Sequence, residues 1–353
     1  MLSALGQLSC FKAYDVRGKL NTEINEKIAL KIGYATAKKL KARNIIVGYD
    51  ARESSRSLSN SVIKGIQAYG TDVLFLGLSG TEEVNYAVTY FGADAGIEIT
   101  ASHNSVKYNG MKIVKSGSKP LTEDEFFDLK FITEKGKFTN SQRPGKLKDI
   151  HKNARLAYIK KIVSFINLES LRPLKIILNS GNGAAGPIVD ELDKYLKNLG
   201  IKTNFIRLHH EPNSNFPNGI PNPMLEENRK VTSDAVKLAD ADFGVAFDGD
   251  FDRCFFFDNL GNFISGEYIV SLLAEIFLNK DKGAKIIHDN RLIFSTTDTV
   301  SEFGGKAFAS KTGHAFVKAA MRAQNAVYGG EMSGHHYFKD FNYCDSGMIP
   351  WLL

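Results

Sequence analysis

The sequence DGDFDR, residues 248–253, places three carboxylates and an arginine at the end of a short apolar run. At about 3.3 Å per residue, Asp248 and Asp252 would lie roughly 13 Å apart in an extended chain, which is too far to share one ion. Gly249 permits a tight turn that brings both of them together with Asp250. Hard cations such as Mg²⁺ prefer carboxylate oxygens, and like charges packed so closely are costly without a cation. The spacing therefore favours a divalent-metal loop over the simpler alternative, an acidic surface turn.

A second group of reactive side chains lies in TASHNSVKYNGMKIV, residues 100–114, which also follows an apolar stretch. Ser102 and His103 are adjacent, and Lys112 follows a glycine, so a hydroxyl, an imidazole and an ammonium can share one loop. A Ser-Asn-Gly loop is ordinarily only a turn, and no G-x-S-x-G elbow supports a hydrolase. From these residues alone, the loop is a candidate nucleophile site.

A glycine-rich motif suggests a competing function. GNGAAG, residues 181–186, follows the apolar run 174–179 and precedes a helical pattern, which is the context of a dinucleotide-binding turn. That fingerprint also requires an acidic residue at the end of the next strand, where this sequence has Arg-Leu-His-His at 207–210. We therefore interpret the glycines as a tight turn between a strand and a helix.

Helical and strand patterns alternate along the chain, which indicates an α/β protein. Residues 211–230 interrupt the alternation with four prolines among five asparagines, which predicts an ordered loop with a functional role. The expected helices cover residues 24–41, 54–70, 153–166, the segment after Gly186, and 269–278, and the expected strands cover residues 44–50, 72–78, 174–179, 202–208, 243–247 and 284–289.

The length of 353 residues predicts several domains, which we place at residues 1–150, 151–253 and 254–353. The first boundary follows a polar region, residues 116–150. At the other end, residues 345–353 are expected to begin a helix, with Asp345 or Ser346 as its cap. That helix would stop after about two turns with its apolar face unmatched.

Bulk composition predicts a soluble, cytoplasmic protein. The hydrophobic fraction is 43% and the charged fraction 24%, and no apolar run reaches the ~18 residues of a membrane span. The start of the chain lacks a signal-peptide pattern, and Cys10, Cys254 and Cys344 form neither a disulfide framework nor a zinc motif. The net charge of +6 is dispersed, so we expect anionic small molecules as partners, and neither nucleic acid nor membrane.

Five motifs in order resemble the α-D-phosphohexomutase family, and the resemblance extends over the whole chain. They are FKAYDVRG (11–18), TASHN (100–104) with YNGMK (108–112), DGDFDR (248–253), KTGHA (311–315) and GEMSGHHYF (330–338). The stretches NSGNGAAGP, NFPNGIPNP and FNYCDSGMIPWLL are similar to the bacterial phosphomannomutase branch of that family. The resemblance implies three consecutive α/β domains, each a mixed sheet between helices. Family members continue into a fourth, C-terminal domain that clamps the distal phosphate of the substrate, and we expect this domain to be missing here.

The resemblance also implies roles for particular residues. Ser102 matches the phosphorylated serine, and Asp248, Asp250 and Asp252 match the residues that hold Mg²⁺ together with an oxygen of that phosphoserine. Phe251 stands where glycine is usual, but no metal ligand changes. The positions around the transferred phosphoryl group match Arg17, Arg253, Lys112 and His103, and the expected substrate contacts are Tyr14, Glu331, Ser333, His335, His314, Arg291 and Lys311. Either Lys112 or His103 can serve as the general base, and the motif favours His335 over its neighbour His336.

The reaction implied by the resemblance is the reversible conversion of mannose 6-phosphate into mannose 1-phosphate. The phosphoserine would give its phosphate to the sugar, and the hexose 1,6-bisphosphate so formed, which is also the activator, would return its other phosphate. The product would serve GDP-mannose and polysaccharide synthesis. Two alternatives stay open at this point: phosphoglucomutase specificity, and a truncated, weakly active or inactive protein that binds Mg²⁺ and phosphosugar.

Overall fold

The computed structural model describes residues 7–353, which contain three β-sheets flanked by helices. The chain divides into two compact units. One comprises the residues up to Arg155 together with Asn213–Asn215, and the other comprises Leu156–Pro212 and Phe216–Leu353. The first unit contains one sheet and the second contains two. The predicted fold class of three α/β domains with mixed sheets between helices is thereby confirmed.

The first sheet runs in the order β1-β5-β4-β2-β3-β7, with β6 paired to β5. Its centre is parallel, because β4, β2, β3 and β7 share one direction, while β5 is antiparallel to both β1 and β4. The apolar runs predicted as buried strands are its central members. The strand bounds are β1 (Val16–Lys19), β2 (Asn44–Tyr49), β3 (Asp72–Leu78), β4 (Ala95–Ile99), β5 (Tyr108–Lys115), β6 (Lys119–Pro120) and β7 (Leu147–Asp149).

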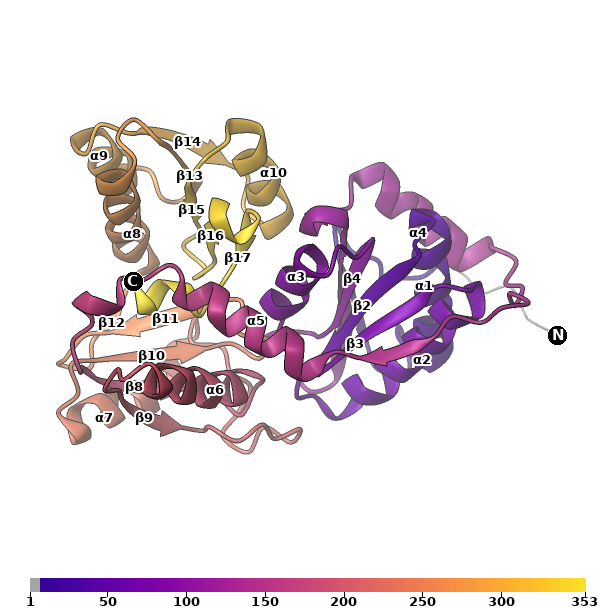
Figure 1. Ribbon diagram of the computed structural model, residues 1–353, viewed down its shortest axis with the longest axis horizontal. Helices are drawn as coiled ribbons and strands as arrows, with labels where there is room; N and C mark the ends of the chain where they lie inside the picture. Colours follow the sequence, from indigo (N-terminus) through magenta and orange to yellow (C-terminus); the bar gives the residue numbers. More distant parts are fainter. Residues whose placement is uncertain (1–6) are drawn as a thin grey trace. The chain divides into compact units, whose positions relative to one another are not determined.

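Helices cover both faces of this sheet. Figure 1 shows α1 (Glu26–Leu40), α2 (Glu53–Tyr69) and α4 (Glu123–Lys135) on one face and α3 (Thr81–Tyr90) on the other. Gly65 lets α1 and α2 meet backbone to backbone, because a Cβ there would lie 1.9 Å from the Leu30 carbonyl oxygen. The apolar side chains between these layers form two buried clusters, one on each face of the sheet.

The region 116–150 is more ordered than its polar composition suggested. It contains α4, which begins with a capping box between Thr122 and Glu125 and buries Phe126 and Leu129 against the core of the first unit. The helix is difficult to predict because most of its surface is charged and only three of its residues are buried. The region therefore belongs to the folded body of the first unit.

The second sheet runs in the order β12-β11-β10-β8-β9, with β10, β8 and β9 parallel and the other two antiparallel. The proposed division between residues 253 and 254 falls between β10 and β11 and stays a prediction. The elements of this part are α5 (His151–Val163), β8 (Lys175–Asn179), α6 (Ala185–Asn198), β9 (Asn204–Leu208), α7 (Lys230–Ala239), β10 (Phe243–Phe247), β11 (Cys254–Phe257) and β12 (Phe263–Ile264). Four short 3₁₀ helices cover Ser116–Ser118, Leu168–Ser170, Glu226–Asn228 and Lys339–Phe341.

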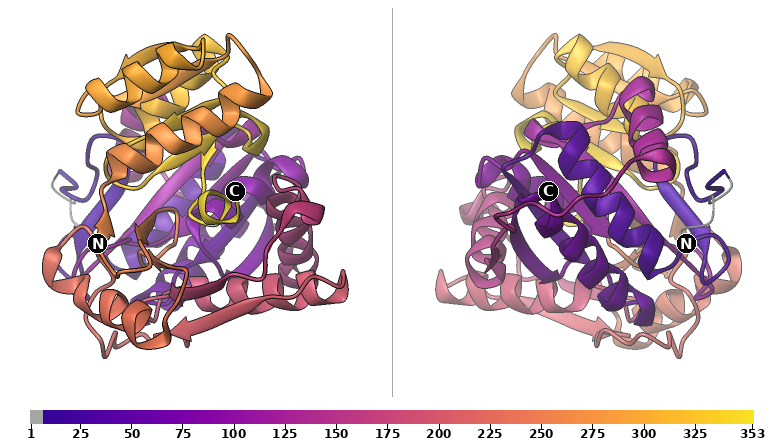
Figure 2. Two further views of the ribbon diagram at one scale, coloured as in Figure 1. Left: turned by 90° about the vertical axis from the view of Figure 1, so that its left-hand side faces the viewer. Right: turned by 90° about the vertical axis from the view of Figure 1, so that its right-hand side faces the viewer.

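The third sheet runs in the order β14-β13-β15-β16-β17, and its first three strands are parallel. Two packed helices, α8 (Gly266–Lys280) and α9 (Phe294–Glu302), cover one face, and α10 (His314–Gln324) covers the other (Figure 1). The left view in Figure 2 shows the face with α8 and α9. The strands are β13 (Lys285–Asp289), β14 (Lys306–Ser310), β15 (Tyr328–Gly330), β16 (His336–Phe338) and β17 (Cys344–Asp345), and α11 (Ile349–Leu352) follows them.

The prediction for residues 345–353 needs two corrections. Asp345 does not cap a helix, because it pairs with Tyr337 in β17. Ser346 is not the cap residue either, because Met348 occupies that position before α11. The Oγ of Ser346 accepts the backbone N–H groups of Met348 and Ile349, both at 3.1 Å. The apolar face of α11 is not unmatched either, because all four of its residues are buried. The apolar side chains of α11 pack against the second sheet, as in the edge-to-face contact between Trp351 and Phe205 of β9.

Two sequence-level expectations concern the chain as a whole. Cys10, Cys254 and Cys344 are buried free thiols, as predicted. Along residues 7–353, none of the helices combines the length and the apolar character that a bilayer crossing requires.

Candidate active site

The Ser102 loop connects β4 to β5 in the first unit. Ser102 is 4% exposed and has a left-handed backbone, with φ of 48°. Its N–H donates to Thr100 Oγ1 at 2.8 Å, which fixes the sharp turn after the buried strand. Its Oγ lies 3.0 Å from Nδ1 of the exposed His103. The predicted nucleophile and one candidate base are therefore within hydrogen-bond distance of each other.

A buried arginine, Arg52, binds the backbone of this loop through its side chain. Arg52, 4% exposed, donates from Nη2 to the carbonyl oxygen of Ser102 at 2.7 Å and from Nη1 to that of Ser105 at 2.9 Å. It also pairs with the buried Asp50, which accepts hydrogen bonds from the hydroxyl groups of Thr100 at 2.7 Å and Ser55 at 2.5 Å. Burial raises the pKa of Asp50 despite the arginine beside it. Asp50 and Arg52 follow β2, the parallel neighbour of β4, so both anchor the loop from the same sheet edge.

Arg17 and Lys112 lie on neighbouring strands, and the Arg17 side chain contacts the same loop. Arg17 lies on β1 and donates from Nη1 to the Ala101 carbonyl oxygen at 2.8 Å and to Asn104 Oδ1 at 2.6 Å. Lys112 lies on β5, directly opposite the buried Glu98 of β4, and is 9% exposed. Tyr14 lies half-buried just before β1. All the predicted residues of the first unit thus belong to the serine loop or to segments beside it.

The aspartate loop connects β10 to β11 in the second unit. Asp248, Asp250 and Asp252 are at most 1% exposed, and a carboxylate oxygen from each lies within 4.8 Å of the others. Arg253 donates to Asp248 Oδ2 from Nε at 2.9 Å and from Nη2 at 2.8 Å. The loop therefore turns inward, as the metal hypothesis requires, and is not an acidic surface turn.

Phe251, the departure from the glycine usual in this motif, occupies a left-handed position with φ of 45° and is fully buried. This backbone conformation is costly for a bulky residue. The burial of its ring opposes that cost. The three carboxylates converge with phenylalanine in this position, so the substitution leaves the proposed ligand set intact.

The GNGAAG glycines pack against the aspartate loop. A Cβ on Gly183 would lie 2.7 Å from the Gly249 carbonyl oxygen, and the N–H of Ala184 donates to that same oxygen at 3.1 Å. Gly181 has a left-handed φ of 55°. These glycines form a tight turn between β8 and α6, as predicted, and the turn packs against the backbone of the aspartate loop.

The predicted sugar-binding residues gather at the carboxyl ends of β13, β14 and β15. Glu331 follows β15, is 1% exposed, and accepts the Gly313 N–H at 2.7 Å and the Tyr337 hydroxyl. Arg291 follows β13 and pairs with Asp289 at 2.5 Å, and Asp289 also accepts the Met332 N–H at 3.0 Å. Ligand sites in α/β sheets lie at such strand ends. The remaining members are the half-buried Ser333 and His314 and the exposed Lys311, whose ammonium lies over the Phe316 ring.

The two adjacent histidines have different environments. His336 is 1% exposed, contacts the Tyr328 hydroxyl through Nδ1 at 2.7 Å, and has its pKa lowered to about 3 by burial and by His335. His335 Nδ1 lies 3.1 Å from Asp345 and 3.8 Å from Asp252. Burial would lower the pKa of His335, but these carboxylates raise it. His336 is thus a core residue. His335 ends the loop between β15 and β16, residues 331–335, which we call the sugar loop after its predicted role, and it lies beside Asp252 of the aspartate loop.

The aspartate loop satisfies the requirements of a hard divalent cation. Its three carboxylates are buried, converge closely, and offer only oxygen donors, which suits Mg²⁺ better than a transition metal.

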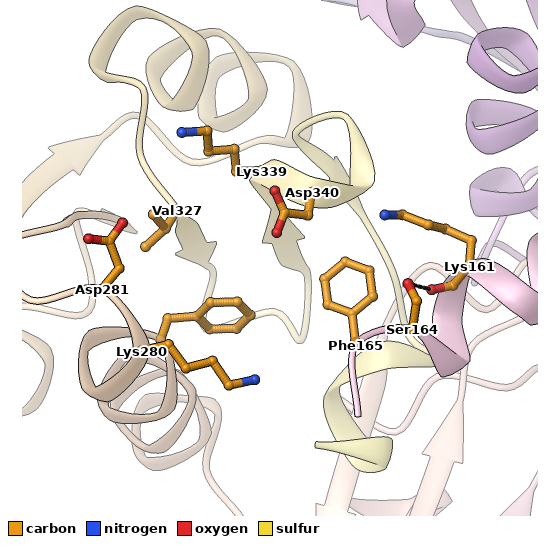
Figure 3. Close-up of a pocket in the computed structure, with 9 residues that line it drawn as sticks. Lys161, Ser164, Phe165, Lys280, Asp281, Val327, Lys339 and Asp340 are labelled. Atoms are coloured by element: carbon orange, nitrogen blue, oxygen red, sulfur yellow. Dashed lines mark hydrogen bonds between the residues drawn. The ribbon is translucent and has the colours of Figure 1, made fainter. Parts of the chain in front are cut away.

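A separate pocket in the second unit, about 280 Å³ in volume, contains none of the predicted site residues (Figure 3). Its wall combines three lysines with two aspartates and two phenylalanines, and two of these lysines already lie over the phenylalanine rings.

Sequence comparison identifies the family. Residues 9–140, 156–261 and 265–353 match the alpha/beta/alpha domains I, II and III of phosphoglucomutase/phosphomannomutase. The chain belongs to this family. It is a phosphohexomutase, with the Ser102 loop in its first unit and the aspartate loop in its second.

Three bacterial proteins show how similar this phosphohexomutase is to known relatives. Phosphomannomutase of Escherichia coli K12 is 53% identical over 350 residues, which cover 98% of this chain and 76% of that protein. Phosphohexose mutases of Xanthomonas campestris are 46% identical with the same coverage. A crystal structure of a phosphoglucomutase/phosphomannomutase family protein from Burkholderia thailandensis has a TM-score of 0.89 at 31% identity, and covers 98% of this chain and 75% of that one. The chain therefore spans about three quarters of the length of these relatives.

Sequence reasoning missed several residues around the phosphohexomutase motifs. Asp50 and Arg52 anchor the serine loop, and Tyr337 holds Glu331. A usable signal existed for the first pair, because both follow an apolar strand next to the one that precedes Ser102. For Tyr337 the sequence offered only a weaker indication of a role, namely its position within the GEMSGHHYF motif.

Proposed function

We propose that this phosphohexomutase interconverts mannose 6-phosphate and mannose 1-phosphate through a phosphoserine at Ser102. The observation that carries the proposal is the convergence of three buried carboxylates in the aspartate loop, because such a cluster suits a cation at a phosphoryl-transfer centre. The choice of mannose is supported by relatives named phosphomannomutase at 50% and 53% identity. The product would feed nucleotide-sugar synthesis such as that of GDP-mannose.

Asp248, Asp250 and Asp252 are the proposed metal ligands, and Mg²⁺ bound there would neutralise charge on the transferred phosphoryl group. The other roles belong to side chains of the chain itself. Arg253 holds Asp248 in place and adds positive charge to the loop. In the serine loop, His103 Nδ1 can exchange a proton with Ser102 Oγ across 3.0 Å, while Lys112 is the second candidate base.

The sugar-binding role is assigned to Glu331, Ser333 and His335, with His314, Arg291, Lys311 and Tyr14 as further contacts. Arg17 is assigned to the surroundings of the transferred phosphoryl group. Glu331 is the firmest of these positions, because the Gly313 N–H and the Tyr337 hydroxyl fix its two carboxylate oxygens. A carboxylate held in this way can accept hydrogen bonds from two sugar hydroxyls in one orientation only. The preference between mannose and glucose phosphates would then depend on how this group meets the hydroxyl that differs between them.

The deciding experiment combines mass spectrometry with a coupled assay. Purified protein should carry phosphate on Ser102 and should form mannose 6-phosphate from mannose 1-phosphate when primed with hexose 1,6-bisphosphate. Ser102→Ala should lose both properties and keep the far-UV circular dichroism of the wild type. Substantial turnover by Ser102→Ala would remove the proposed nucleophile.

The same assay separates the alternatives. Faster turnover of glucose 1-phosphate would identify phosphoglucomutase specificity. Binding of phosphosugar without turnover, measured by calorimetry, would identify a binding protein with little or no activity.

A further inference from the structure

A buried lysine lies close to the sugar loop without belonging to any of the predicted site motifs. Lys318, on α10, is 2% exposed, and its Nζ lies 2.6 Å from Asp345 Oδ1. A lysine is rarely buried to this degree, because removing its charge from water is costly unless a partner compensates. The partner is Asp345 of β17, itself fully buried.

The second oxygen of Asp345 meets His335. Its Oδ2 lies 3.1 Å from His335 Nδ1. Burial alone would raise the pKa of Asp345, but Lys318 and His335 together hold it well below its ordinary value, so the carboxylate is charged. The backbone of Asp345 is also fixed, because it pairs with Tyr337 in the sheet. Two side-chain contacts thus connect Lys318 of α10 to Asp345 of β17, and Asp345 to His335 of the sugar loop.

The environment of Asp345 argues against a second metal site at this point. Asp252, His335 and Asp345 lie close enough together to hold an ion. However, the Lys318 ammonium already provides a positive charge at 2.6 Å from Asp345. A cation beside that ammonium would be repelled. The lysine therefore neutralises the carboxylate and leaves it to act on the histidine.

We propose that Lys318 and Asp345 are positioning residues for His335. Lys318 fixes the Asp345 carboxylate, which accepts the Nδ1–H of His335 and so sets the orientation of the imidazole and directs Nε2 to the phosphosugar. A hydrogen bond to one ring nitrogen fixes the role of the other. The inference rests on the proposed function, because that function assigns His335 to the substrate.

The first test observes the histidine without any substrate. In ¹⁵N-histidine-labelled protein, the His335 Nδ1–H should give a hydrogen-bonded proton resonance, assigned by its absence in His335→Gln. The double variant Lys318→Met with Asp345→Leu should lose that resonance, because the acceptor is gone. Persistence of an unchanged resonance in the double variant would overturn the proposal.

The double variant also addresses folding. Removing one partner of a buried pair leaves the other charge uncompensated, whereas replacing both by apolar residues of similar size is often tolerated. Lys318→Met alone should therefore unfold at lower denaturant than the wild type, and the double variant should recover most of the loss. If Lys318 and Asp345 only stabilised the fold, the double variant would recover mutase activity together with stability.

The expected kinetic result is different. The double variant should keep a kcat/KM about 10- to 100-fold below the wild type, the usual cost of losing a residue that orients an active-site histidine. Asp193→Asn is the matched control, since it removes a buried carboxylate that pairs with Lys197 and Arg207 far along the sequence from the site. It should lower stability and leave kcat/KM unchanged. Wild-type kcat/KM in the double variant would refute the positioning role.

A failure of the proposed function can be distinguished from a failure of the positioning role. A wild-type protein without phosphate on Ser102 and without turnover would remove the mutase assignment. The histidine resonance and its loss would still report whether Asp345 holds His335.

Discussion

Arg253 binds Asp248 through two of its nitrogens, with Nε and Nη2 at 2.9 and 2.8 Å from the same carboxylate oxygen. Both side chains are buried. Burial alone would lower the pKa of Arg253, but Asp248, Asp252 and Asp250 raise it, so the guanidinium stays charged. One positive charge therefore compensates part of a cluster of three aspartates before any cation binds.

Arg253→Met is expected to lower the free energy of unfolding by about 3–5 kcal/mol, because it leaves buried carboxylates without their cationic partner. Urea unfolding without divalent metal would measure this loss. Added Mg²⁺ should restore part of the stability, since the ion would compensate the same charges. Arg253→Lys, which keeps the charge but loses the two-nitrogen contact, should lie between the wild type and Arg253→Met. An equal loss with and without Mg²⁺ would contradict metal binding at this loop.

Asp250→Asn is expected to weaken the response to Mg²⁺. Binding of an ion to the native state alone raises the melting temperature, and the rise depends on the ratio of ion concentration to dissociation constant. The wild type should show this rise in a thermal melt, and the variant should need a much higher Mg²⁺ concentration for the same effect. Asp258→Asn, in the turn after β11 and outside the aspartate loop, is the control. An Mg²⁺ response identical in Asp250→Asn and wild type would place the metal elsewhere.

Arg52→Lys is expected to slow phosphorylation of Ser102 by about tenfold to a hundredfold, because one ammonium cannot reach all the carbonyl oxygens that the guanidinium holds. The rate of phosphate incorporation from hexose 1,6-bisphosphate, followed by intact-protein mass spectrometry, measures the effect. Arg56→Lys, on the exposed side of α2, provides the matched control. A normal rate in Arg52→Lys would show that the serine loop keeps its shape without this anchor.

His336 is expected to make the protein less stable in mild acid. Its pKa is lowered from 6.5 to about 3 in the folded state, so the unfolded chain takes up a proton that the native one refuses. Stability from this source is complete above pH 6.5 and falls as the pH drops toward 3. Between pH ~7.5 and ~5.5 the loss should be about 1.4 kcal/mol.

The measurement compares urea unfolding of the wild type and His336→Gln at these two pH values. Titrating groups that do not interact with His336 contribute equally to both proteins and cancel in the difference. The variant should lose less stability on acidification than the wild type does. Identical losses would show that His336 does not titrate in this way.

Much of the fold and both motif loops could be predicted because their signals are local. An apolar run followed by Asp-Gly-Asp or by Thr-Ala-Ser-His marks a strand and the loop after it, and neither depends on distant residues. The helix α4 was hidden because few of its residues face the core. The roles of the individual site residues remain proposals.

The supporting contacts were beyond sequence reasoning because they join distant segments. Arg52 reaches the Ser102 loop across 50 residues, and this contact depends on β2 lying beside β4. Asp345 looked like a helix cap by its position before an apolar run. The pairing of β16 with β17 instead makes it a strand residue that faces His335. Strand order and register decide such contacts, and neither is encoded in a short motif.

The grip of Arg52 on the serine loop has a consequence for protein engineering. Its guanidinium contacts carbonyl oxygens of the main chain at Ser102, Asn104 and Ser105, and so does not discriminate between amino-acid types. The exposed residues 105–107 can therefore be randomised in a library while the serine keeps its placement. Sequence variation at these three positions would then leave the backbone of the nucleophile in place.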